Sequence, residues 1–258
     1  MRLDCYLYVN GSVDSRNKAQ QLIKLGRISV NGKVETKPSR EVNGGDSVNI
    51  LKELDFASMG GYKLDKALND FSLDISGDVA IDIGASNGGF TSCMLGRGVK
   101  KVYAVDVGEC VFSKELLSDL RVIVRDKLNA RDVKVDDIGE SADFISIDVS
   151  FISLTLILKN TLDLLKEDGR CVALIKPQFE VGRKALSKKG MVLDKKERLK
   201  AVFAILDFIA DIGYKVTDFT VAPIRENRNT EYLILIERTG FNVMKNKIEA
   251  VIMGEKSL

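Results

Sequence analysis

The sequence predicts an α/β protein, in which a small α+β unit precedes a Rossmann-like, mostly parallel sheet covered by helices on both faces. From residue 79 onward, strand-sized apolar segments alternate with helical segments, which is typical of such a sheet. Residues 1–50 instead show short helical patterns followed by hairpin signals. A chain of 258 residues is long enough for two hydrophobic cores, so we expect two domains.

The N-terminal unit has clear local signals. Ser15 is a favoured N-cap, apolar residues follow it at helical spacing, and Gly26 is placed to end this helix. Asn31-Gly32 is the strongest short hairpin signal. A second glycine turn at residues 43–46 leads into another alternating segment.

Basic charge is concentrated in this unit. Residues 1–50 contain eight Lys and Arg against five Asp and Glu, whereas the whole chain has a net charge of only +2. A basic face on a small unit suits contact with nucleic-acid phosphates, although an ordinary solvated surface is the alternative. The candidate RNA-binding residues are Arg2, Arg16, Lys18, Arg27 and Lys33.

Seven segments after residue 78 have the composition of buried strands. A long helical pattern at residues 194–213 has a polar first turn and an apolar face, and Gly213 is placed to end it. The tail could form a final helix, and nothing in it predicts an oligomeric state. The expected strands are residues 79–84, 101–108, 121–125, 142–150, 170–177, 216–224 and 231–237.

A glycine-rich loop follows the first of these strands, where cofactors approach the backbone in open parallel sheets. Asp82 and Gly84 precede the pair Gly88-Gly89, so the dinucleotide spacing G-x-G-x-x-G is absent. An acid before the first glycine disfavours a pyrophosphate and suits the cationic methionine end of S-adenosylmethionine. Asp106, at the end of the next strand, is placed to accept hydrogen bonds from ribose hydroxyls.

The chain contains no histidine, so any proton transfer must use another side chain. Asp148 and Lys176 lie at two further strand ends, at the edge expected to hold the cofactor. A lysine there is costly to bury unless paired, and partial desolvation favours the neutral amine that can accept a proton. Lys63 and Glu231 could reach the same cleft. A solvated lysine at a strand end is the alternative for Lys176.

The composition argues against a membrane protein, a secreted protein and a cysteine-based metal site. The apolar runs are too short for a membrane span, and residues 1–13 do not resemble a secretory signal. The cysteines form no C-x-x-C pair, which favours reduced thiols and gives no metal site. We therefore expect a cytoplasmic protein without a metal. The cysteines are Cys5, Cys93, Cys110 and Cys171.

Several motifs together resemble the TlyA family of ribosomal RNA 2′-O-methyltransferases, also known as hemolysin A proteins. The resemblance implies an S4-like RNA-binding domain at residues 1–52, a linker at 53–62, an FtsJ-like class I methyltransferase domain at 63–240 and a tail at 241–258. The motifs that carry it are "RLD", "SRNKAQQLI" and "GRISVNGK", then "GGYKL", "DIGASNGGFT", "VYAVDVG", "DVSFISL", "LIKPQFEVG" and "NTEYL".

The resemblance also implies a site. The Lys-Asp-Lys-Glu tetrad of the FtsJ group falls on Lys63, Asp148, Lys176 and Glu231. Asp106 and Val107 would hold the ribose of S-adenosylmethionine, and Asn129 its adenine. The methionine end would be lined by Asp82, Gly84, Ala85, Ser86, Gly88, Gly89 and Phe90, with Asp148 beside it.

The sequence departs from the family pattern at three places. Met59 stands where relatives often have arginine, Asn87 replaces the residue before the paired glycines, and Glu109-Cys110 replaces a G-x-x-Q-L segment. The first departure removes a basic RNA contact, and the others alter the adenosine pocket.

We expect Lys176 to accept the proton of a ribose 2′-hydroxyl, with Asp148 supporting the lysine and Lys63 and Glu231 orienting the ribose. The substrate implied is a cytidine of ribosomal RNA within a ribosomal subunit. Three alternatives remain: an RNA-binding protein with an inactive methyltransferase fold, a membrane-active hemolysin and a pseudouridine synthase. The loop at Asp82 argues against the last, because such an isomerase needs no cofactor.

Overall fold

The computed structural model describes residues 1–52, 54–223 and 228–254. Residue 53 of the predicted linker, residue 224 of a predicted strand and residues 255–258 of the predicted tail lie outside these ranges. The chain divides into two compact units, Met1–Met59 and Gly60–Leu258, and the division falls inside the predicted linker. Each unit has a hydrophobic core of its own.

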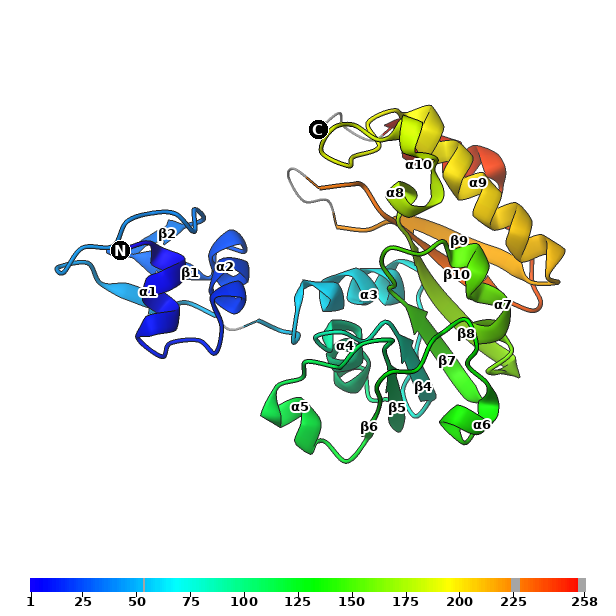
Figure 1. The fold of residues 1–258 in the computed structure, drawn as a ribbon, viewed down its shortest axis with the longest axis horizontal. Helices are drawn as coiled ribbons and strands as arrows, with labels where there is room; N and C mark the ends of the chain where they lie inside the picture. The colour runs from blue at the N-terminus through cyan, green and yellow to red at the C-terminus, as the bar shows by residue number, and fades with distance from the viewer. Residues whose placement is uncertain (53, 224–227, 255–258) are drawn as a thin grey trace. The chain divides into compact units, whose positions relative to one another are not determined.

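The first unit packs two short helices against a small antiparallel sheet (Figure 1). The core contains Leu7, Leu22, Ile23 and Ile28, all nearly or fully buried. The sheet order is β2-β1-β3. The elements are α1 (Leu3–Val9), α2 (Arg16–Lys24), β1 (Ile28–Val30), β2 (Lys33–Glu35) and β3 (Val48–Ile50).

The local signals of this unit are confirmed. Ser15 Oγ accepts a hydrogen bond from the Lys18 amide at the start of α2. Gly26 adopts a left-handed φ of +66° just after that helix, and its amide donates to the Ile23 carbonyl. Asn31 and Gly32, with φ of 52° and 75°, form the tight turn between β1 and β2.

The second unit is built on a seven-stranded sheet with the order β6-β5-β4-β7-β8-β10-β9. Only β10 runs antiparallel to its neighbours, β8 and β9, so the predicted mostly parallel sheet is confirmed. The strands are β4 (Val79–Ile83), β5 (Lys101–Val105), β6 (Val122–Arg125), β7 (Ala142–Ile147), β8 (Leu165–Ile175), β9 (Lys215–Val221) and β10 (Tyr232–Glu237).

Helices cover both faces of this sheet, with α3 and α4 on one side and α7 and α9 on the other (Figure 1). Helix α10, from the predicted tail, buries Ile248 and Ile252 in the core on the α9 side. No helix in the described ranges is long and apolar enough to span a membrane. The helices are α3 (Met59–Asp70), α4 (Gly89–Gly96), α5 (Lys114–Ser118), α6 (Val135–Ile138), η1 (Leu154–Leu156), α7 (Leu158–Leu162), α8 (Pro177–Glu180), η2 (Arg183–Ala185), α9 (Lys195–Asp211) and α10 (Lys245–Gly254).

The central strands are apolar because helices bury them on both faces. All five residues of β4 are buried, and their side chains alternate between the two faces of the sheet. Ile81 and Ile83 face the core under α7 and α9. Asp82 points to the opposite face, where Thr91 of α4 donates a hydrogen bond to it. The carboxyl ends of the parallel strands therefore form one edge, above which their loops meet.

Candidate active site

Four charged side chains from separate parts of the second unit meet at this edge. Lys63 lies in α3, Asp148 follows β7, Lys176 follows β8 and Glu231 immediately precedes β10. Lys63 Nζ is 2.7 Å from Glu231 Oε2 and 3.7 Å from Asp148 Oδ2. Lys176 Nζ is 2.6 Å from Asp148 Oδ1. The structure thus brings the four residues together in the order Glu231, Lys63, Asp148, Lys176.

The cluster alternates in charge and is largely enclosed. Its side chains are only 10% to 18% exposed, with Lys176 the most enclosed. Two ammonium and two carboxylate groups at these distances balance each other's charge, which offsets the cost of removing them from water. Lys176 Nζ also donates to Ser150 Oγ at 2.8 Å. Lys176 is therefore held by two partners from the loop after β7.

Gly84 permits the close approach of the loops after β4 and β7. The Asp148 amide donates to the Ile83 carbonyl at 3.0 Å. A Cβ atom on Gly84 would lie 2.5 Å from the Asp148 carbonyl oxygen, and Gly84 has a left-handed φ of +87°. No other residue type fits this position without moving the backbone that carries Asp148.

Beside the cluster lies a pocket of about 430 Å³, within the range typical of small-molecule sites. Its lining combines residues that follow β4, β5, β6 and β7. Six of the predicted cofactor residues belong to this lining: Gly84, Ser86, Asp106, Val107, Asn129 and Asp148.

Asp106 orders the rim of the pocket. Its carboxylate accepts from the Ser86 amide at 2.9 Å and from the Gly108 amide at 2.8 Å. Ser86 has a positive φ of 48°, so this bond stabilises an uncommon backbone conformation in the glycine-rich loop. Asn129 uses its side-chain oxygen to accept from the Arg131 amide at 3.0 Å. Both residues line the pocket, and their contacts with a nucleoside stay a prediction.

Asp82 does not line the pocket, and its contact with the cofactor stays a prediction. It is fully buried, and its carboxylate accepts from Thr91 Oγ1 at 2.6 Å and Ser146 Oγ at 3.0 Å. Burial raises the pKa of Asp82 to about 7. The strand directs this side chain toward α4, so Asp82 supports the loop from beneath by joining α4 to β7.

Four further residues predicted to contact the cofactor also lie outside the pocket lining. Gly88 has φ +74°, and a Cβ there would lie 2.3 Å from a Leu116 side-chain atom. Its role in the structure is close packing against the segment that contains Phe112 and Leu116. The others, Ala85, Gly89 and Phe90, are buried.

Sequence reasoning missed the residues that connect the loops after β7 and β8. Glu180 in α8 accepts from Ser153 Oγ at 2.6 Å and from the Leu154 amide at 3.0 Å. Burial raises the pKa of Glu180. Phe151, 91% exposed with a φ of 64°, lines the pocket and lies 5.1 Å from the Phe179 ring, measured between centroids. Only the positions of Phe151 and Glu180, three and four residues after Asp148 and Lys176, could have suggested these contacts.

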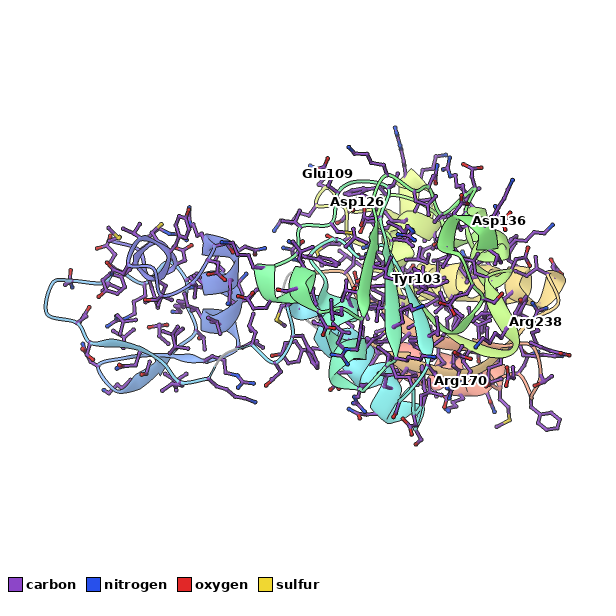
Figure 2. All side chains as sticks on the ribbon, turned by 90° about the horizontal axis from the view of Figure 1, so that it is seen from below. Tyr103, Glu109, Asp126, Asp136, Arg170 and Arg238 are labelled. Atoms are coloured by element: carbon purple, nitrogen blue, oxygen red, sulfur yellow. The ribbon has the colours of Figure 1, made fainter. Side chains whose placement is uncertain are left out.

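The segment that departs from the family pattern is tied to the neighbouring loop. The Cys110 amide donates to Asp126 Oδ1 at 2.7 Å, and Glu109 pairs with Lys127 at 3.1 Å. Figure 2 shows Glu109 and Asp126 near each other, on the loops after β5 and β6. Burial raises the pKa of the Cys110 thiol. The departure thus gives a loop with its own contacts beside Asp106.

In the first unit, two of the predicted RNA-binding residues share one buried partner. Asp4 is fully buried and accepts from Arg2 Nε and Nη2, Arg16 Nε and Gln20 Nε2 at 2.7 to 3.1 Å. The arginine side chains remain 46% and 49% exposed. The Arg2 guanidinium holds the pKa of Asp4 well below its usual range. Asp4 therefore fixes two exposed guanidinium groups in one place.

The other three basic residues are arranged separately. Lys18 pairs loosely with the exposed Asp14 at 3.4 Å, and Arg27 pairs with Asp55 at 3.2 Å. Lys33 lies exposed at the start of β2, beyond the Asn31-Gly32 turn.

Comparisons with known proteins match both units. The S4 domain family matches residues 1–48, and the FtsJ-like methyltransferase family matches residues 56–238. Hemolysin A from Brachyspira hyodysenteriae is 37% identical over 90% of this chain and 98% of its own. The 16S/23S rRNA (cytidine-2′-O)-methyltransferase TlyA from Mycobacterium tuberculosis is 33% identical over 90% of this chain and 88% of its own. A solved structure, a candidate hemolysin from Streptococcus thermophilus, is 36% identical with a TM-score of 0.77, and the match covers 98% of this chain and 94% of that one.

Proposed function

Because the chain belongs to the TlyA family, in which an S4 domain precedes an FtsJ-like methyltransferase domain, we propose that it methylates the ribose 2′-hydroxyl of a cytidine in ribosomal RNA. The observation that supports this most strongly is the enclosed cluster of Lys63, Asp148, Lys176 and Glu231 beside the pocket. The substrate is ribosomal RNA within a ribosomal subunit, reached in the cytoplasm.

The pocket fits S-adenosylmethionine by its position and its chemistry. Gly84 and Ser86 leave backbone exposed at the carboxyl end of β4, and Asp106 at the end of β5 offers a carboxylate for ribose hydroxyls. Asn129 lies at the part of the lining that would meet the adenine. When bound, the cofactor supplies an electrophilic methyl group. The residues of this chain hold it and present the acceptor hydroxyl to it.

Lys176 is the proton acceptor in this proposal. Its amine must first lose its own proton to water. Asp148 Oδ1 at 2.6 Å and Ser150 Oγ at 2.8 Å hold the nitrogen in place. Asp148 then stabilises the ammonium that forms as the 2′-hydroxyl gives up its proton. Lys63, held between Glu231 and Asp148, orients the ribose. A large part of the rate comes from this alignment.

The direct test is transfer of labelled methyl from S-adenosylmethionine to separated ribosomal subunits that lack the modification. The modified nucleotide is then mapped by mass spectrometry. We expect 2′-O-methylcytidine in at least one subunit. If neither subunit is labelled while the protein binds S-adenosylmethionine, the alternative of an RNA-binding protein with an inactive methyltransferase fold is favoured.

The role of Lys176 is tested by Lys176→Ala. We expect methyl transfer to fall by about 10² to 10⁴-fold, the usual contribution of general acid–base catalysis, while the affinity for S-adenosylmethionine measured by calorimetry stays within about twofold, since removing a catalytic base need not weaken cofactor binding. Lys166→Ala is the matched control, because Lys166 lies near the start of β8, at the opposite end of this strand from Lys176. Wild-type turnover by Lys176→Ala would show that another group accepts the proton.

A further inference from the structure

The segment between α8 and α9 carries a concentrated positive charge. Residues 181–193 contain four basic and no acidic residues. Arg183, Lys184, Lys188 and Lys189 are all exposed. Among the residues that the structure describes, no carboxylate forms an ion pair with any of them. We name residues 182–190 the basic loop.

The end of the basic loop is an ordered turn. The Gly190 amide donates to the Ser187 carbonyl at 2.8 Å, which closes a β-turn with Lys188 and Lys189 at its two central positions. Ser187 also pairs with Met191, through its amide at 2.9 Å and its hydroxyl at 3.0 Å. Gly190 has a φ of 72°, as the chain reversal requires. The two lysines at the tip are therefore presented to solvent on an ordered support.

The basic loop is attached to both catalytic strands. On one side, α8 connects it to Lys176 at the end of β8. On the other side, Asn229 accepts from the Val192 amide at 2.8 Å and donates to the Gly190 carbonyl at 3.0 Å. Asn229 lies two residues before Glu231, a separation of at most about 7 Å along the chain. These contacts hold the loop close to the tetrad.

We propose that the basic loop is a phosphate-binding arm of the methyltransferase unit, positioned by Asn229, which holds the backbone of the substrate RNA beside the tetrad. This inference rests on the proposed function for its substrate. Lysine and arginine on an exposed turn bind phosphates without reading bases. RNA is favoured over an anionic membrane, because Leu186, the large apolar residue of the basic loop, is half-buried, whereas insertion into lipid needs an exposed apolar face.

The test measures how binding of the full chain to ribosomal subunits depends on salt. Lys184→Gln, Lys188→Gln and Lys189→Gln are combined in one variant, and Lys100→Gln, Lys159→Gln and Lys215→Gln in a control of equal charge. Lys100 and Lys215 lie at the edge of the sheet opposite the tetrad. We expect the loop variant to bind at least about tenfold more weakly near 0.1 M salt, with a slope of log affinity against log salt smaller by about 2 to 3. The control should retain the wild-type slope.

Each outcome decides one point. An unchanged slope in the loop variant, or an equal loss in the control, overturns the proposal. Binding of wild-type protein to vesicles with anionic lipid, lost in the loop variant while RNA binding is kept, would assign the loop to a membrane and also overturn it. If the wild-type protein transfers no methyl group but the loop variant loses RNA affinity, the proposed activity fails while the binding arm stands.

Asn229→Ala tests the positioning role separately, because it leaves every charge in place. We expect KM for the ribosomal subunit to rise about three- to tenfold, with kcat at saturating substrate and the affinity for S-adenosylmethionine unchanged. A general loss of structure would lower kcat and the melting temperature together. Unchanged KM would show that the loop needs no anchor at Asn229.

Discussion

Asp148 is held in place by three different kinds of contact. Its carboxylate contacts both lysines of the tetrad, its amide bonds to the Ile83 carbonyl, and its carbonyl oxygen packs against the bare Cα of Gly84. Gly84 is thus a determinant of the acid's position, although it has no side chain to contribute.

Gly84→Ala tests this role. We expect methyl transfer to fall at least about 10²-fold, because an ångström-scale displacement of a reacting group can have that effect. Gly77→Ala is the matched control: Gly77 has a similar φ of +80°, but a Cβ there meets nothing within 4 Å. The melting temperature and the turnover of the control show the effect of backbone strain alone. Equal losses in the two variants would remove the specific role of Gly84.

At this scale the sequence predicted where the charges are, but not how each side chain points. Lys176 and Asp148 follow apolar strands, so their edge of the sheet could be inferred. Asp82 lies inside a strand whose five residues are all buried, and such a run does not reveal which face each residue takes. Asp4 was unassigned because two of its partners, Arg16 and Gln20, come from another helix.

Among the elements, α4 contacts the sheet through a buried carboxyl group, that of Asp82, as well as through apolar side chains. Thr91 of α4 and Ser146 of β7 both donate to Asp82, whose burial raises its pKa from 3.8 to about 7. The folded chain therefore binds a proton on the Asp82 carboxyl group more tightly than the unfolded chain does. The stability contributed is fully present below about pH 4 and is lost as the pH rises through about 7.

Asp82→Asn is expected to remove this pH dependence. Between pH 4 and 7, the free energy of unfolding of the wild-type second unit should fall relative to the variant by up to about 1.4 kcal/mol per pH unit. Urea unfolding of both proteins at several pH values gives the difference. A constant difference between pH 4 and 8 would show that Asp82 has the same charge in the folded and unfolded chains.

Elements with strong local sequence signals were predicted correctly. Elements that depend on tertiary packing were predicted less accurately. The Asn31-Gly32 turn and helix α9 with Gly213 after it are confirmed. The start of α3 was not predicted: Gly60 and Gly61 were assigned to the linker at residues 53–62, but α3 begins at Met59. Gly61 is buried, so tertiary packing outweighs the low helix propensity of glycine here.

The whole molecule has two separate cores, so a substitution can destabilise one unit without destabilising the other. The core around Leu7 and Leu22 belongs to the first unit, and the core under α7 and α9 to the second. A unit of about 60 residues is only marginally stable by itself. The ion pairs of Asp4 therefore make up a larger share of the free energy of unfolding than similar pairs would in the larger unit.

Asp4→Asn should destabilise the first unit by about 2 kcal/mol, a figure that allows for the half-exposed arginines. The lowered pKa of Asp4 means that its stabilisation is present above about pH 4 and is lost as the pH falls below it. Hydrogen exchange should show reduced protection in α1 and α2 and none lost in β4 or β7. Asp14→Asn, at an 84% exposed side chain, is the control. Equal effects in both units would contradict independent cores.

The antiparallel strand β10 has a consequence for how the protein becomes active during synthesis. Glu231 immediately precedes β10, which enters the sheet between β8 and β9 at the edge where the four charges meet. Because Glu231 comes last of the four in the sequence, it is the last to leave the ribosome, long after Lys63. A nascent chain can bury β4, β5 and β7 and form the glycine-rich loop, yet it leaves Lys63 without its nearest carboxylate. The cluster of four charges is therefore completed only after residue 231 has been made, and a translation product truncated before that residue would lack it.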